Sequence, residues 1–243
     1  MPEPLNAYLP AYQDEFLYAL DNRLILNWYP QRIMSMAQGD SLLELGVGHG
    51  FSTHLFAQHF KRHVVLEGSS AVIQQFQQNF PDCGAEIVAG YFETFETTER
   101  FDVIVMGFVL EHVDAPEVIL SRFKSFLKPG GSIYLTVPNA EALNKRLGYE
   151  AGLLPSLFQL GAGDLALGHQ RLFSVETLKT LVQQCGYRCE TLEGIFLKPI
   201  TTQQIQTLAL SEAILQGMLK VGIHYPELCV ALFMEIKEAE TIA

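Results

Sequence analysis

The chain has 243 residues, of which 49% are hydrophobic and 18% are charged, so a sizeable core is expected and global disorder is excluded. Its 16 Lys and Arg residues against 27 Asp and Glu residues give a formal net charge of -11. This charge argues against a nucleic-acid-binding protein, which needs a basic surface. The short basic cluster at residues 61–63 is expected to form the solvated end of a helix.

The four cysteines form no CxxC pair, so neither a zinc site nor a disulfide framework is predicted. Reduced thiols indicate a cytoplasmic protein. Residues 1–6 lack the basic region and apolar run of a signal peptide. The longest apolar runs, such as residues 103–106, are too short to span a bilayer, so no membrane partner is expected.

Strand-like and helix-like runs alternate along the chain, which predicts a parallel sheet with helices on both faces. The strands are expected at residues 41–47, 63–66, 86–89, 101–106, 132–137, 188–197 and 228–236. Helical periodicity predicts helices at residues 51–60, 71–80, 116–127 and 174–185. Ser174 is the expected cap of the last helix. The sequence KPGG at residues 128–131 predicts a helix stop and a tight reversal before the fifth strand.

Two segments, residues 139–170 and 201–225, are too long to be simple connections, and the second is expected to be mostly helical. Extra segments beside the carboxyl ends of strands tend to cover the ligand crevice of an open α/β sheet. The alternative is that they extend the core or form a dimer contact. Since no repeat or linker interrupts the chain, residues 1–243 are expected to form a single domain.

The most informative stretch is LLELGVGHG at residues 42–50, where an apolar strand leads into the alternate glycines Gly46, Gly48 and Gly50. Glycine adopts positive φ angles and lets the backbone approach a ligand closely. Glu67 follows Gly46 by 21 residues (67 − 46), at the end of the second strand. A carboxylate in this place can accept hydrogen bonds from both hydroxyls of a ribose, so a nucleoside site is predicted.

The spacing of the glycines separates two classes of ligand. A dinucleotide-binding turn has the pattern GxGxxG, but Phe51 occupies the sixth position here. The pattern is instead GxGxG, preceded by Glu44 within the strand. It favours S-adenosyl-L-methionine over a nicotinamide dinucleotide.

With its remaining blocks, the chain resembles class I S-adenosylmethionine-dependent methyltransferases, in the small-molecule branch that includes ubiquinone-type O-methyltransferases. The matching blocks are residues 42–50, 64–67, 101–105 with 110–113, 127–131 with 137–139, and GHQRLFS at residues 168–174. The resemblance is strong over about residues 40–190. It implies a doubly wound, Rossmann-like, seven-stranded and mostly parallel sheet with an antiparallel last strand.

The resemblance also implies which residues bind the cofactor. Glu67 would bind the ribose hydroxyls, and Gly107 with Phe108 would lie beneath the sulfonium. The residues along the methionine part and the ribose would be Glu44, Gly46, Gly48 and Gly50.

The segment after the third strand departs from the family pattern. An acidic residue often follows this strand directly, whereas here it comes only as Glu93. We expect Tyr91 or Phe92 to pack on the adenine. The alternative is that both are ordinary core aromatics.

Methyl transfer requires an acceptor held in line with the methyl group and, for many acceptors, a base. His112, just past the fourth strand, is the leading candidate for the base, and His169 is the second. The alternative is that these rings fix their loops, with Arg171 orienting an acidic group of the substrate. His54, His59 and His63 are expected at the surface.

The predicted function is therefore methyl transfer from S-adenosyl-L-methionine to a small-molecule acceptor, with O-methylation slightly favoured and S-adenosyl-L-homocysteine as the product. No metal site is predicted, because Glu111, His112 and Asp114 lack identifiable further ligands. The chain could pair with a second copy as a homodimer. The alternatives are a non-catalytic, methyltransferase-like protein that binds a partner and, with less support, a nicotinamide-dependent reductase.

Overall fold

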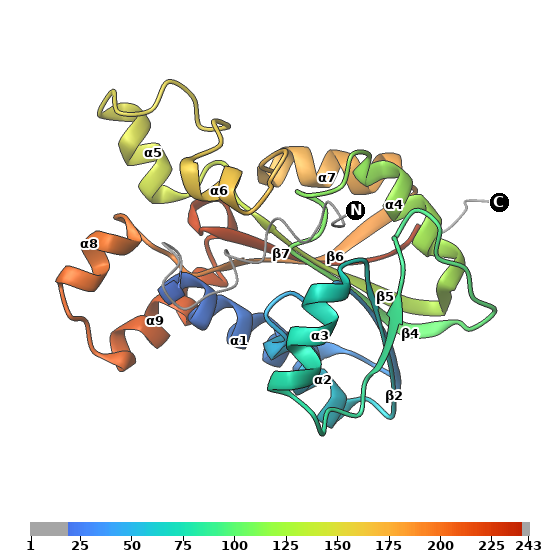
Figure 1. Cartoon of the computed structure of the whole chain (residues 1–243). Helices are drawn as coiled ribbons and strands as arrows, with labels where there is room; N and C mark the ends of the chain where they lie inside the picture. Colours follow the sequence, from blue (N-terminus) through green and yellow to red (C-terminus); the bar gives the residue numbers. More distant parts are fainter. Residues whose placement is uncertain (1–18, 240–243) are drawn as a thin grey trace.

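The computed structural model describes residues 19–239 (Figure 1). The stretch in which no signal peptide was expected lies outside these residues. One sheet has the strand order β3-β2-β1-β4-β5-β7-β6. Strands β1 to β5 are parallel, and β7 lies antiparallel between β5 and β6. The predicted fold class is confirmed. The strands are β1 (Ser41–Leu45), β2 (Arg62–Glu67), β3 (Glu86–Ala89), β4 (Phe101–Gly107), β5 (Leu127–Pro138), β6 (Tyr187–Ile195) and β7 (Ala231–Glu238).

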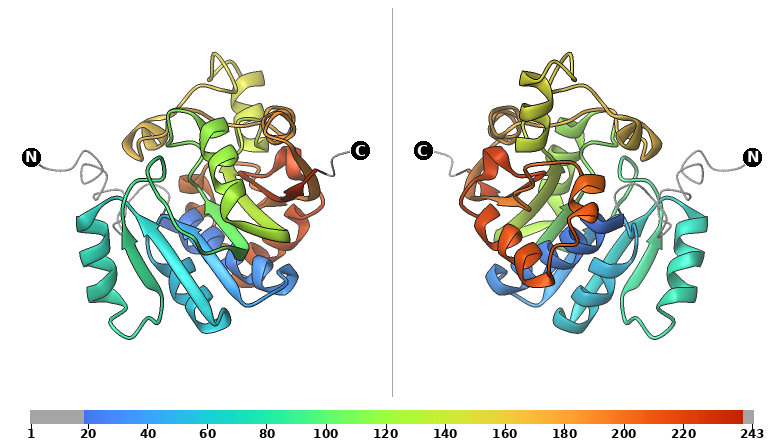
Figure 2. Two further views of the ribbon diagram at one scale, coloured as in Figure 1. Left: turned by 90° about the vertical axis from the view of Figure 1, so that its right-hand side faces the viewer. Right: turned by 90° about the vertical axis from the view of Figure 1, so that its left-hand side faces the viewer.

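Helices cover both faces of the sheet (Figure 1). One face carries α4 (Pro116–Phe123) and α7 (Val175–Gln184). The other carries α1 (Ala19–Met36), α2 (Phe51–His59), α3 (Ser70–Asn79), α8 (Thr202–Thr207) and α9 (Glu212–Gly222). Two short helices, α5 (Leu143–Glu150) and α6 (Ala162–Ala166), stand off the sheet (Figure 2). Within residues 19–239, no helix is long and apolar enough to cross a membrane.

Alternate side chains of β1 pack into two different hydrophobic clusters, one on each face of the sheet. Leu43 and Leu45 pack in the cluster beneath α4 and α7, whereas Leu42 packs in the cluster beneath α1 and α2. Glu44 shares the face of Leu42, because successive strand residues point to opposite faces. Since both faces are covered, every residue of β1 is buried, so the carboxylate of Glu44 needs polar partners inside the protein.

Two predictions about the region before β5 are wrong, the end of a helix and a tight reversal. The helix expected at residues 116–127 ends at Phe123 and continues only as the 3-10 turn η2 (Lys124–Phe126). Residues 128–131 form no reversal but a bulge inside β5. Leu127 pairs with Phe101 and Ser132 with Val103, so five steps along β5 match two along β4. By contrast, Ser174 caps α7 as predicted, since its side chain accepts a hydrogen bond from the Thr177 N–H.

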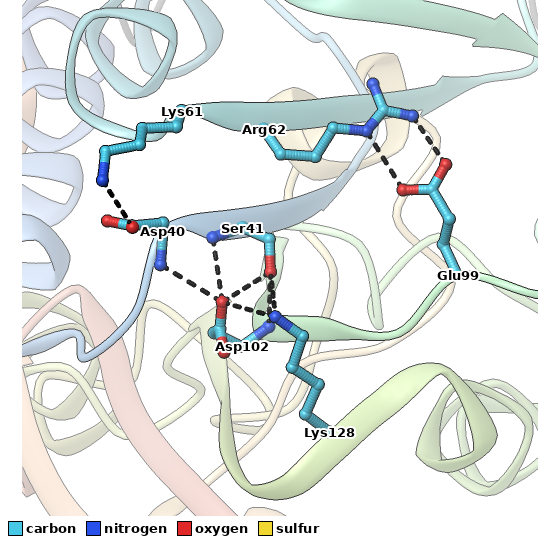
Figure 3. A network of polar contacts seen from close by, with 7 residues as sticks. All are labelled: Asp40, Ser41, Lys61, Arg62, Glu99, Asp102 and Lys128. Atoms are coloured by element: carbon cyan, nitrogen blue, oxygen red, sulfur yellow. Dashed lines mark hydrogen bonds and ion pairs between the residues drawn. The ribbon is translucent and has the colours of Figure 1, made fainter.

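The carboxylate of Asp102 links the amino ends of neighbouring strands in the sheet (Figure 3). Its Oδ2 accepts hydrogen bonds from the backbone N–H of Asp40 (3.1 Å) and of Ser41 (3.0 Å), and from the Ser41 hydroxyl (2.6 Å). Lys128, on the bulge of β5, adds an ion pair of 2.9 Å. Three strands therefore start from one polar centre. The bulge residues lie at this edge, opposite the carboxyl ends where a ligand is expected.

Candidate active site

The strand order reverses between β1 and β4, and an open α/β sheet binds its ligands at such a point. A cavity of about 950 Å³ lies there. It is lined by the turn after β1, the end of β2, the loop after β4 and part of α1. Both long segments also contribute, for example through Lys145, Leu154 and Thr201. Residues predicted for the cofactor and for catalysis thus border one cavity.

The three glycines of the turn have positive φ angles, but they serve two different purposes. A Cβ atom added to Gly46 or Gly48 would meet no protein atom within 4 Å, so both leave an open cradle along the cavity. A Cβ on Gly50 would lie 2.6 Å from the ring of Phe76. Gly50 borders the cavity but is required mainly for the packing of the turn against α3.

Glu67 is buried at the end of β2, and its carboxylate is hydrogen-bonded to the backbone of the glycine turn. Oε2 accepts a hydrogen bond from the Val47 N–H (3.0 Å), and Oε1 accepts one from the Ser69 N–H (2.7 Å). Burial raises its pKa, and the backbone hydrogen bonds oppose that rise. A carboxylate offers about four acceptor positions, which outnumber these backbone hydrogen bonds, so Glu67 can still accept from a donor on a ligand in the cavity.

Glu44 also borders the cavity, but its oxygens have partners beneath the turn. The Ser52 hydroxyl donates to Oε1 (2.7 Å), and His63 Nε2 lies 3.1 Å from Oε2. His63 is only 4% exposed, so its predicted place at the surface is wrong. It sits near the start of β2, where the parallel pairing with β1 turns its ring toward Glu44.

At the end of β4 the backbone makes an unusual turn. Phe108 has a φ of 57°, and its N–H donates to the Thr136 carbonyl (2.8 Å). The Phe108 ring meets Tyr29 of α1 edge to face, with 6.1 Å between centroids. A Cβ on Gly107 would lie 2.6 Å from the Tyr29 hydroxyl oxygen. A side chain at position 107 would therefore displace the Tyr29 hydroxyl, and Tyr29 is a residue of this corner that the sequence motifs did not reveal.

The two aromatic residues after β3 both border the cavity. Tyr91 is 47% exposed, whereas Phe92 is partly buried against the core beneath α4. Tyr91 therefore has a ring face available at the mouth of the cavity, while Phe92 also has a core role.

His112 and His169 come together although 57 residues separate them (169 − 112). Their rings meet edge to face, with centroids 4.8 Å apart. The backbone of Gly168 lies next to the His112 ring, and His169 Nδ1 lies 3.4 Å from Asp164 Oδ1. Burial, with the neighbouring His169, lowers the pKa of His112 to about 4, so its ring is neutral at pH 7.

Glu111 lies behind this histidine pair. It is fully buried, and neither carboxylate oxygen has a hydrogen-bond partner among the described residues. Burial raises its pKa to about 7. Ligand atoms of Glu111, His112 and His169 lie within 4.8 Å of one another, and within residues 19–239 no other group of His, Cys, Asp and Glu could hold a metal ion.

Arg171, which the alternative interpretation of the histidines placed against an acidic group of the substrate, is bonded to backbone carbonyls. Its guanidinium donates to the carbonyls of Leu110, Val113 and Asp114. Gln170 adds a hydrogen bond from its side chain to the His112 carbonyl (2.7 Å). These contacts fix the segment that carries His169 to the loop that carries His112.

A buried ion pair lies elsewhere on the cavity wall. Lys198 pairs with Asp21 of α1 and donates to the Thr202 hydroxyl (2.8 Å). Both Lys198 and Asp21 border the cavity. Sequence motifs gave no indication of this pair, because its members are 177 residues apart.

Comparison with known proteins agrees with this geometry. The family model described as a methyltransferase domain matches residues 19–192. The chain belongs to this methyltransferase family. The recognition predicted from the motifs, a class I S-adenosylmethionine-dependent methyltransferase, is thereby confirmed at the level of the family.

Individual relatives are distant. The mitochondrial ubiquinone biosynthesis O-methyltransferase of Homo sapiens is 31% identical over 107 residues, which are 44% of this chain and 28% of that protein. The ubiquinone biosynthesis O-methyltransferase of Stutzerimonas stutzeri is 26% identical over 122 residues, covering 49% of this chain and 52% of the relative. The chain thus matches only about a quarter to a half of the length of these curated relatives.

Solved structures show the same fold. A methyltransferase of Thermotoga maritima has a TM-score of 0.62 at 20% identity, over 90% of this chain and 92% of that one. The N-methyltransferase NodS of Bradyrhizobium japonicum, in complex with S-adenosyl-L-homocysteine, has a TM-score of 0.57 at 16% identity, over 97% and 100% of the two chains.

Proposed function

We propose that this methyltransferase-family protein transfers the methyl group of S-adenosyl-L-methionine to a small-molecule acceptor, with an oxygen favoured as the receiving atom. The observation that carries the proposal is the single cavity of about 950 Å³ at the strand reversal. The glycine turn and Glu67 border it, and so do His112 and His169.

The chain's own residues fit the proposed cofactor. Gly46 and Gly48 leave open space that any Cβ would fill, and this space suits the methionine part and the ribose. Glu67 keeps acceptor capacity beyond its bonds to the backbone, which suits a ribose hydroxyl. Tyr91 offers a partly exposed ring to the adenine.

The bound cofactor would supply an activated methyl group on a sulfonium, so the protein needs no nucleophile of its own. Its task is to hold the acceptor in line with the methyl group at about 3–3.5 Å. Gly107 and Phe108 form the corner at which we place this encounter. Gly107 carries no side chain, and a Cβ there would come within 2.6 Å of the Tyr29 hydroxyl oxygen.

His112 is our first candidate for the group that takes the acceptor's proton, and His169 is the second. Because its pKa is lowered to about 4, the His112 ring is neutral at pH 7, and one nitrogen of a neutral ring is an acceptor. A buried neutral histidine suits a hydroxyl acceptor, which must lose a proton when it is methylated. The curated relatives named above carry O-methyltransferase in their names, which supports the same choice.

Binding measurements test the proposal. S-Adenosyl-L-methionine and S-adenosyl-L-homocysteine should each raise the melting temperature, because a ligand at 100 times its Kd stabilises the folded state by about 2.7 kcal/mol. NAD should not. Glu67→Ala should weaken cofactor binding by about 1.5–3 kcal/mol, the usual loss for a hydrogen bond to a charged group.

Glu96→Ala is the matched control, since Glu96 pairs with Arg122 at the surface. Its cofactor affinity should equal that of the wild type. A wild-type protein that binds no cofactor would contradict the proposed function. Cofactor binding without S-adenosyl-L-homocysteine formation across a broad panel of hydroxylated acceptors would favour the non-catalytic alternative.

A further inference from the structure

Lys198 and Asp21 form a buried ion pair on the cavity wall that the proposed chemistry does not use. The two residues are 3% and 7% exposed, and both border the cavity. Besides Asp21, the Lys198 ammonium donates only to the Thr202 hydroxyl (2.8 Å) among residues 19–239. An ammonium has three N–H donors, so one is left over, and Asp21 Oδ1 has no hydrogen-bond partner among these residues. The pair is therefore incomplete as a purely structural contact, because unfilled buried polar groups destabilise a fold.

The backbone that places Lys198 is strained and firmly held. Phe196, fully buried directly after β6, has a φ of 62°, which bulky residues rarely adopt. The Val230 N–H donates to the Phe196 carbonyl (3.2 Å), and the Leu197 N–H donates to the Met218 carbonyl of α9 (3.1 Å). Backbone strain of this kind persists only where the surrounding structure imposes it. The turn after β6 thus brings Lys198 against α1, on the side of the sheet where α8 and α9 also lie (Figure 1).

The ion pair lies away from the proposed cofactor end of the cavity. β6 is four strands from β1 in the sheet, which is about 19 Å at the usual strand spacing of about 4.8 Å. On α1, Asp21, Ile25 and Tyr29 follow at intervals of four residues and all border the cavity; eight residues of helix (29 − 21) rise about 12 Å. Tyr29 stands beside Gly107, where the methyl group is proposed to meet its acceptor. The pair is therefore placed for the far end of an acceptor, on the order of 10 Å from the reacting atom.

The charges around the cavity determine which kind of group fits there. Six acidic residues of the described part of the chain border it, against the two lysines Lys145 and Lys198. An anionic acceptor would be repelled by these carboxylates, and the charge of Lys198 is already balanced by Asp21. An uncharged carbonyl oxygen can accept the remaining N–H without adding a charge. The acidic residues are Asp21, Glu44, Glu67, Glu93, Asp114 and Asp164.

We propose that Lys198, oriented by Asp21 and Thr202, determines specificity by donating a hydrogen bond to an uncharged carbonyl group at the far end of the methyl acceptor. This inference rests on the proposed function and deepens it. It names the substrate class as uncharged compounds with a reacting hydroxyl and a carbonyl roughly 10 Å apart. No proton is transferred and no covalent bond forms at Lys198 in this role.

Three phenols that differ only at the far end of a short para side chain test the assignment. para-Hydroxybenzylacetone carries a ketone there, para-hydroxyphenylpropanoate a carboxylate, and para-butylphenol no oxygen. Their binding to protein saturated with S-adenosyl-L-homocysteine is measured by ligand-observed NMR titration, which detects weak affinities. The wild type should bind the ketone about tenfold more tightly than para-butylphenol, the low end of the effect of a hydrogen bond to a charged group. The carboxylate should bind more weakly than the ketone.

A double variant separates this role from a merely structural one. Asp21→Asn combined with Lys198→Met removes both charges together, because Lys198→Met alone would leave a buried carboxylate unpaired and could prevent folding. The double variant should keep the wild-type affinity for S-adenosyl-L-homocysteine and bind para-hydroxybenzylacetone no more tightly than para-butylphenol. Lys61→Met is the matched control, since Lys61 pairs with Asp40 at the surface. It should keep the preference for the ketone.

Each outcome decides the inference. A preference for the ketone that the double variant abolishes, with para-butylphenol binding unchanged, supports it. A wild type that binds none of the phenols or prefers the carboxylate overturns it, and so does a folded double variant that keeps the preference, weakens all three phenols equally or loses cofactor affinity.

If the double variant does not fold, wild-type crystals soaked with para-hydroxybenzylacetone decide instead. The ketone oxygen should lie within hydrogen-bond distance of Lys198 Nζ, and a ketone bound elsewhere overturns the inference. All of these contrary results leave the proposed function standing as long as the wild type binds S-adenosyl-L-homocysteine. A wild type that does not bind it overturns the proposed function, and the inference with it.

Discussion

His112 and His169 illustrate how a site can be built from residues that have no local motif in common. The segment with His169 is held to the loop with His112 by Gln170 and Arg171. The histidine pair therefore has a fixed geometry independent of any ligand. Glu111 is buried beside this pair, and its carboxylate oxygens have no hydrogen-bond partner among the described residues, an arrangement that the packing of the fold does not explain.

If His112 takes the acceptor's proton, His112→Ala should reduce turnover by about 10²- to 10⁴-fold, the usual contribution of a general base. The affinity for S-adenosyl-L-homocysteine should change little, since the glycine turn and Glu67 are untouched. Turnover is followed by S-adenosyl-L-homocysteine release once an acceptor is found, and cofactor affinity by calorimetry. His59→Ala, at an exposed position of α2, is the matched control. Wild-type turnover in His112→Ala would exclude this residue as the base.

Motifs located most of these residues but not the contacts between them. The glycine turn, Glu67 and His112 were predictable because spacing along strands fixes where their backbones emerge. Tyr29 was not, because α1 has no motif and its contact with Gly107 joins elements 78 residues apart (107 − 29). His63 was misplaced for a similar reason: its partner Glu44 lies on a neighbouring strand, and only the pairing of β1 with β2 brings them together.

At the scale of elements, β1, β4 and β5 show why periodicity predicted the strands of the sheet well but predicted poorly where each strand begins. Apolar runs fix where a strand lies, since both faces are covered by helices. They do not fix where it begins. The strand β5 begins before its bulge, where the ammonium of Lys128 forms an ion pair with Asp102. This tertiary contact outweighs the turn preference of the Pro and Gly residues that follow.

The Asp102 centre predicts how stability depends on pH. Partial burial raises the pKa of this carboxyl, but hydrogen bonds from Ser41, Lys128 and the backbone outweigh that effect and lower it to about 2. A carboxyl whose folded-state pKa lies below its unfolded value stabilises the fold fully above the unfolded pKa. That stabilisation is lost as the pH falls toward the folded value.

The free energy of unfolding should therefore fall as the pH drops from about 4 to about 2, and Asp102→Asn should show a smaller fall. At pH 7 this variant should be less stable by about 1.5–3 kcal/mol, because a hydrogen-bonded charge is lost. Urea unfolding at several pH values measures both effects. The surface variant Glu96→Gln should behave as the wild type. Identical pH profiles for Asp102→Asn and the wild type would refute the assignment.

At the scale of the whole molecule, the cavity wall divides into a part that belongs to the core and a part that does not. The glycine turn and Glu67 continue directly from the buried strands β1 and β2, so the proposed cofactor end is anchored in the core. The segment around α5 differs, since no residue of that helix is buried. It stands off the sheet in Figure 2 and borders the cavity through Lys145 and Leu154.

This division predicts that the segment can be shortened without loss of the fold. Replacing residues 143–158 by a short Gly-Ser linker should change the melting temperature by no more than about 2–4 °C, the shift that about 1 kcal/mol produces in a domain of this size. The start and the end of the segment lie near each other, since Lys145 Nζ donates to the Gln159 carbonyl (3.0 Å). Affinity for S-adenosyl-L-homocysteine should stay within about twofold, since neither the glycine turn nor Glu67 is altered.

Turnover should fall at least about tenfold, because the acceptor would lose part of its enclosure and water would enter the cavity. Light scattering and calorimetry check the fold and cofactor binding before activity is measured. A control linker of equal composition inserted between α8 and α9, at residues 208–210, should leave turnover closer to that of the wild type, since Leu208 is exposed and does not border the cavity. If the shortened protein instead loses cofactor affinity while keeping its fold, the segment belongs to the cofactor end, and the proposed division of the cavity is wrong.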